Sequence, residues 1–134
     1  GGICLARGFV ASGLSAQVGD ALTLVAVLPV FLMMLLLALV VTFLTEATSN
    51  TATTALLMPV LAAVALAVDI DPLWLMVPAA MSASCAFRLP VATAPNAVVF
   101  GSGELPIQRM VREGLVLNLF GAIVIAGLMA LILQ

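Results

Sequence analysis

The sequence predicts an all-α membrane protein, and three observations support that prediction. Of its 134 residues, 65% are hydrophobic and 7% are charged, whereas about a quarter of a soluble domain is charged. The mean hydropathy is +1.37. Apolar runs recur along the whole chain rather than once near its start, which distinguishes the pattern from a secretory signal peptide. We therefore expect several helices that lie in a lipid bilayer.

The charged and reactive side chains argue against two other classes of protein. The formal net charge is −2 and the chain has no His, so it lacks the basic face that a nucleic-acid partner requires. Without His, the commonest proton relay and metal ligand is absent. The few carboxylates are scattered, so we do not expect an enzyme. Cys4 and Cys85 lie far apart in apolar surroundings, and we expect two reduced, buried thiols rather than a disulfide or a metal site.

The N-terminal part of the chain divides into an initial segment, residues 1–20, and a longer apolar region, residues 21–68. The initial segment is rich in glycine and begins GGICLARGF without Met, so we expect a piece of a longer polypeptide. No charged residue lies between Asp20 and Glu46. That stretch is long enough for one tilted span of roughly 20 residues, or for a shorter span joined to part of another. The run over 51–68 is slightly short for a full span.

The C-terminal part contains three further segments. Residues 73–101 form an apolar stretch interrupted by RLPVATAPN, whose prolines cannot extend a regular helix. Residues 104–113 form a polar link, which we expect on the cytoplasmic side because Arg109 and Arg112 precede the last span. Residues 115–133 form an ordinary spanning helix, which places the C-terminus outside.

The polar stretch TEATSNTATT interrupts apolar sequence on both sides. Thr48, Ser49 and Asn50 are residue types that begin helices, so we expect one helix to end near Glu46 and another to begin near Thr51. Free N–H groups and the positive dipole end at the start of the second helix suit an anion. Free carbonyl oxygens at the end of the first helix suit sodium. Short, interrupted apolar segments are typical of transporter binding sites.

Two questions about this stretch remain open at the level of sequence. The hydroxyl groups of Thr48 and its neighbours can instead bond to carbonyl groups one turn earlier, or join helices together. Glu46 is either functional, as carboxylates inside a membrane are by default, or it is the partner of Arg88.

The second break, PVATAPN, offers a similar set of polar groups. Pro90 frees a carbonyl group, Thr93 supplies a hydroxyl and Asn96 an amide. Non-helical backbone around Ala92 can direct carbonyl oxygens inward. Taken alone, the segment is equally consistent with a surface loop between helices. Because one binding site needs ligands from more than one segment, the presence of both breaks favours the functional interpretation.

Together the two motifs resemble the signatures of the divalent anion/sodium symporter family, the sodium-dependent dicarboxylate, citrate and sulfate carriers. Ser49–Thr51 reads Ser-Asn-Thr, and ASCAFRLPVATAPNAVV over 83–99 resembles the family's other signature. The resemblance covers nearly the whole chain. It implies the C-terminal half of a transporter built from two inverted repeats, each with a re-entrant helical hairpin and a broken helix, and the N-terminal repeat is missing. One departure is Ala94, where the family often has Pro.

The resemblance also implies roles for individual residues. Residues 49–51 would form the tip of the hairpin. Four residues would contact a substrate carboxylate: Ser49, Asn50, Thr51 and Thr93. Sodium would be bound by four positions, of which the second and fourth act through the backbone: Thr45, Thr48, Asn50 and Ala92.

From this resemblance we expect sodium-coupled symport of a di- or tricarboxylate-like divalent anion by alternating access, with sodium as the coupling ion. We expect a multi-pass protein of the inner membrane that forms a homodimer, with the bilayer and the N-terminal repeat as its other partners. One alternative is a carrier for another anion, of the sulfate or arsenite type. The other is a non-transporting membrane subunit whose polar breaks only join helices.

Overall fold

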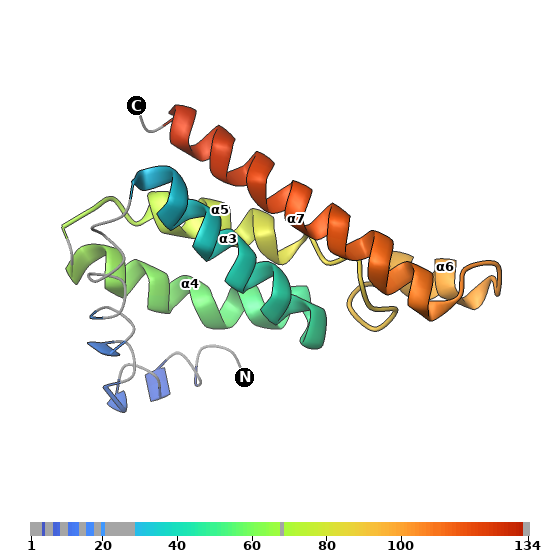
Figure 1. The fold of residues 1–134 in the computed structure, drawn as a ribbon. Coiled ribbons are helices and arrows are strands. Elements are labelled where there is room, and N and C mark those ends of the chain that lie inside the picture. Colours follow the sequence, from blue (N-terminus) through green and yellow to red (C-terminus); the bar gives the residue numbers. More distant parts are fainter. Residues whose placement is uncertain are drawn as a thin grey trace.

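The computed structural model describes residues 29–67 and 69–132 continuously, together with residues 4, 7, 8, 11–13, 16, 17 and 20. The continuous ranges contain five helices, labelled as in Figure 1: α3 (Val30–Ala47), α4 (Asn50–Ala67), α5 (Leu73–Ala83), α6 (Ala94–Gly101) and α7 (Ile107–Ile132). No strand occurs in these ranges. The prediction of an all-helical chain is therefore confirmed for the described residues. Much of the initial segment, and residues 21–28 of the predicted first span, lie outside them.

Helices α3 and α4 are separated by two residues, Thr48 and Ser49. Thr48 has extended backbone angles, φ −129 and ψ 172, and its N–H donates to the carbonyl of Thr45. Helix α4 begins immediately afterwards at Asn50. In Figure 1 the two helices meet at this break and separate away from it, and α5 packs against both of them.

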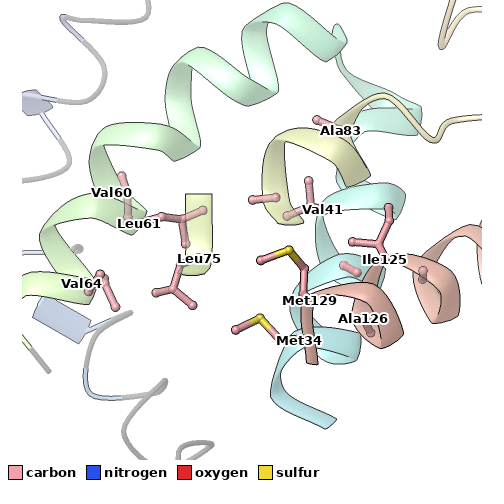
Figure 2. Packing of buried hydrophobic residues seen from close by; sticks show 14 residues of the cluster. Met34, Val41, Val60, Leu61, Val64, Leu75, Ala83, Ile125, Ala126 and Met129 are labelled. Carbon is pink, nitrogen blue, oxygen red and sulfur yellow. The ribbon is translucent and has the colours of Figure 1, made fainter. Parts of the chain in front are cut away.

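The apolar core lies where α3, α4, α5 and α7 face one another. Met34 on α3 lies near Met129 on α7, and Leu75 on α5 faces Val60 and Val64 on α4 (Figure 2). Four buried alanines lie at these contacts and allow the helices to approach closely: Ala38, Ala79, Ala122 and Ala126. Large apolar side chains also cover the outward faces of these helices, as contact with lipid requires.

Helix α7 is continuous from Ile107 to Ile132, so it includes most of the polar link that the sequence separates from the last span. Within the described ranges it is the one helix long and apolar enough to cross a bilayer by itself. Helices α3, α4 and α5 are apolar but shorter. For α4 this agrees with the sequence, in which the run over 51–68 is slightly short for a full span.

The chain between α5 and α6 is not helical. Helix α5 ends at Ala83 and α6 begins at Ala94; we call residues 84–93 the unwound segment. Helix α6 starts where Thr93 caps it, with Pro95 in its first turn, where a missing N–H costs nothing. The interruption predicted around residues 88–96 is present, and it begins earlier than the prolines alone would require.

Candidate functional site

A group of three oxygen atoms lies where α3 ends, α4 begins and α5 ends. The hydroxyl of Thr45 lies 2.7 Å from Oδ1 of Asn50 and 3.0 Å from the carbonyl oxygen of Ala83, and it is directed as a donor toward both. A threonine hydroxyl has one proton, so it can donate to only one of these acceptors at a time. Thr45 is fully buried. The group therefore has more acceptor capacity than its own donors satisfy.

The other residues of the first break lie closer to the surface. The Thr48 hydroxyl donates to the Leu44 carbonyl one turn earlier and also bonds with the hydroxyl of Thr53. For Thr48, the alternative of a back-bond within its own helix is thus realised. Ser49 and Thr51 are exposed, and Asn50 is half-buried. The first N–H groups of α4 have no partner within that helix, as at any helix start.

The second break is organised around Asn96. Its side-chain amide donates to the carbonyls of Ala86 at 2.8 Å and Leu89 at 3.0 Å. The NH₂ group of Asn96 therefore fixes the unwound segment and is not free to donate to a ligand. The Thr93 hydroxyl accepts the N–H of Asn96 at 3.3 Å, which leaves its own proton available as a donor. Ala92 is buried.

Glu46 connects the two breaks, and its partners differ from the sequence prediction. Its carboxylate accepts the backbone N–H of Arg88 at 2.9 Å and that of Leu89 at 3.0 Å. It also accepts the side-chain amide of Asn118 at 2.6 Å. Of the two alternatives left open for Glu46, the partnership with Arg88 is present, but it is made by that residue's backbone N–H and not by its guanidinium group. The Arg88 guanidinium instead lies 5.5 Å from the ring centre of Phe43, a cation–π contact.

The structure brings some predicted site residues together and leaves others apart. Thr45 and Asn50 are in direct contact. In the described ranges, no hydrogen bond joins Ala92 or Thr93 to the α3–α4 break directly; they are linked to it through the unwound segment and Glu46. Sequence reasoning missed Ala83 and Asn118. Ala83 contributes only a backbone carbonyl, which no residue type reveals. Asn118 could have been found, because an amide side chain inside an apolar span is unusual.

Both cysteines are free thiols. Cys85 is half-buried in the unwound segment, and Cys4 is exposed. The expectation that both lie buried is therefore wrong for Cys4.

The fold and the site define a helical membrane protein in which two polar helix breaks are joined by buried hydrogen bonds. A family model described as "sodium:sulfate symporter transmembrane region" matches residues 1–133. The chain belongs to that family, which confirms the family resemblance of the sequence motifs.

The chain is similar to several proteins that carry the name sodium-dependent dicarboxylate transporter SdcS. The protein from Staphylococcus saprophyticus is 46% identical over 125 residues, which cover 93% of this chain and 24% of the relative. The protein from Staphylococcus aureus strain USA300 matches with the same identity and coverage. These are names of transporters and not of enzymes, in agreement with the prediction made from the residues.

The chain spans 24% of the length of these relatives, and it contains both signature motifs. Its place in the C-terminal half of a transporter with two inverted repeats stays a prediction.

Proposed function

We propose that this chain is part of a sodium-coupled symporter for a di- or tricarboxylate-like divalent anion. The observation that supports the proposal best is the oxygen group at Thr45, Asn50 and Ala83, where three helix ends meet. It occurs in a chain whose relatives are named as sodium-dependent dicarboxylate transporters. The family description names sulfate instead, so the substrate is part of what must be tested.

The donor set fits sodium, a hard cation that prefers oxygen ligands. The three proposed ligands are all neutral: the Thr45 hydroxyl, the Asn50 amide oxygen and the Ala83 carbonyl. The last two already lie within hydrogen-bond distance of the first. A bound cation would satisfy the acceptor that the single hydroxyl proton leaves unpaired. The Glu46 carboxylate nearby already accepts three N–H donors, so we do not propose it as a ligand of the ion. We propose that the backbone at Thr48 and Ala92 completes the coordination.

The anion is proposed to bind beside the sodium, at the start of α4. Ser49 and Thr51 are exposed there, and the first N–H groups of the helix suit a carboxylate. The Thr93 hydroxyl has a free proton to donate. Asn50 contributes its amide oxygen to sodium and its NH₂ group to the anion. The proposed ligands are neutral, so bound sodium supplies a positive charge that attracts the dianion. The dianion therefore binds well only after the cation.

In this proposal α3 and α4 form the re-entrant hairpin, with its tip at residues 49–51, and α5 and α6 form the broken helix. Their shortness supports this, since within the described residues neither α3 nor α4 is long enough to count as a full span. The substrate-binding unit then moves against the rest of the transporter, which gives alternating access. A homodimer in the inner membrane with the C-terminus outside also stays a prediction.

Uptake by the complete protein in proteoliposomes tests this function. We expect labelled succinate or citrate to accumulate only with an inward sodium gradient. Accumulation of sulfate or an arsenic oxyanion instead would establish the rival carrier. Accumulation without sodium would refute the coupling, and absence of transport for every anion tested would favour a non-transporting subunit.

A further inference from the structure

Two buried polar side chains, Glu46 on α3 and Asn118 on α7, bind each other and the same stretch of backbone. Glu46 is 4% exposed and Asn118 is 0% exposed. The Asn118 amide nitrogen donates to Glu46 Oε1 at 2.6 Å, and its Oδ1 accepts the N–H of Phe87 at 3.1 Å. An amide and a carboxylate in apolar surroundings are costly unless they are paired, and here each polar atom of both side chains has a hydrogen-bond partner.

Together these side chains accept three successive backbone N–H groups of the unwound segment. Asn118 accepts from Phe87, and the two oxygens of Glu46 accept from Arg88 and Leu89. A non-helical segment inside a membrane protein needs such partners, because neither a helix nor water supplies them. Three consecutive N–H groups are thus satisfied from two helices.

Helix α7 is also shaped to receive this segment. Gly114 lies one turn before Asn118, on the same face of the helix. A Cβ atom at Gly114 would lie 2.7 Å from Cα of Arg88, closer than such atoms approach in proteins. Gly114 therefore lets the backbone at Phe87 and Arg88 approach α7 closely, and Asn118, one turn later, binds the N–H of Phe87.

The end of α3 contacts both the end of α5 and the unwound segment that follows it. Thr45 contacts the carbonyl of Ala83, where α5 ends, and its neighbour Glu46 binds Arg88 and Leu89. Leu89 lies three residues before Ala92. A shift of Glu46 thus moves the proposed sodium ligand Thr45 and the segment that leads to Ala92 and Thr93 together.

We propose that Glu46 and Asn118 are positioning residues for ligand binding: through one shared set of hydrogen bonds they fix the unwound segment relative to the sodium ligands at the end of α3. Neither contacts the substrate or the ion. This inference rests on the proposed sodium-coupled function. It adds that α7, which supplies no proposed ligand, determines how well the site binds both sodium and anion.

The pairing predicts a particular pattern in a double-mutant cycle. Asn118→Asp places a second carboxylate against Glu46, so it should raise the half-saturating sodium and substrate concentrations at least about tenfold, the equivalent of one lost buried hydrogen bond. Glu46→Gln keeps an acceptor for Asn118 but loses the one for Leu89, and should have a smaller effect. When both substitutions are combined, the introduced Gln amide can donate to the introduced carboxylate, so Asn118→Asp should cost little further in the Glu46→Gln background.

Thr42→Val is the matched control. Thr42 is fully buried one turn before Glu46, and its hydroxyl contacts the Ser82 carbonyl at 3.4 Å, outside the unwound segment. We expect this variant to keep the parent half-saturating concentrations. Sodium and substrate titrations of uptake by the complete protein, with maximal rates recorded separately, provide the measurement, because a loss of folded protein lowers only the maximal rate.

The outcomes separate this inference from the function on which it rests. A parent protein without sodium-dependent uptake overturns the proposed function. If the parent transports, two results overturn the positioning role alone. One is that Asn118→Asp is equally costly in the parent and in the Glu46→Gln variant. The other is that Asn118→Asp leaves the half-saturating concentrations unchanged. If Asn118→Asp does not reach the membrane in folded form, recovery of folded protein by adding Glu46→Gln supports the pairing, and equal loss in both proteins refutes it.

Discussion

Replacing Thr45 with valine is the sharpest test of the sodium site, because it removes one oxygen atom without changing the shape of the side chain. The parent hydroxyl lies 2.7 Å from Asn50 Oδ1 and 3.0 Å from the Ala83 carbonyl. Without sodium, the substitution removes one neutral hydrogen bond, worth about 1 kcal/mol. With sodium bound, it removes a contact between an oxygen and a charge, worth about 2–3 kcal/mol.

The difference between the two states is about 1.5 kcal/mol, which corresponds to roughly a tenfold loss of sodium affinity. The assay is sodium-dependent uptake by the complete protein, titrated in sodium at saturating anion, with thermal unfolding measured in sodium-free buffer. Thr45→Ser keeps the oxygen and should stay close to the parent in sodium affinity. If Thr45→Val lowers the unfolding temperature but keeps the parent half-saturating sodium concentration, the hydroxyl is only a structural hydrogen bond.

Three further substitutions test other parts of the site. Asn50→Ala should abolish both sodium-dependent uptake and substrate binding, since this amide is proposed to serve both ligands; normal uptake would remove it from the site. Thr93→Ala should raise the half-saturating substrate concentration more than that of sodium, and equal shifts would argue against its role as an anion donor. Gly114→Ala should push the unwound segment away from α7, at a cost of about 1–3 kcal/mol in stability, and weaken sodium binding. Gly127→Ala on the same helix, where a Cβ meets nothing within 4 Å, should do neither, and similar losses in both variants would contradict the close fit.

The positions of the helix breaks were predictable because they depend on neighbouring residues. Polar residues that cap helices occur at Thr48–Asn50, and α3 ends and α4 begins there. Thr93 likewise caps α6, with Pro95 just after it. These effects act over one or two turns, so they can be read directly from the order of residues.

The partners across the fold were not predictable in the same way. Glu46 has three N–H donors from α7 and the unwound segment, and the sequence offered only Arg88 as its candidate. Charge favours that guanidinium as a partner, but the unwound backbone also needs acceptors, and Glu46 lies where it can supply them. The Arg88 side chain is directed to Phe43 instead.

The sequence by itself determined a helical membrane chain, two polar breaks and the residue types at them, because hydropathy and capping are local properties. Only the tertiary structure decided which groups meet. The Ala83 carbonyl contacts Thr45 because α5 ends beside the end of α3, and Asn118 contacts Glu46 because α7 packs against α3. A carbonyl has no residue type of its own, and a pairing between distant helices depends on how their faces pack.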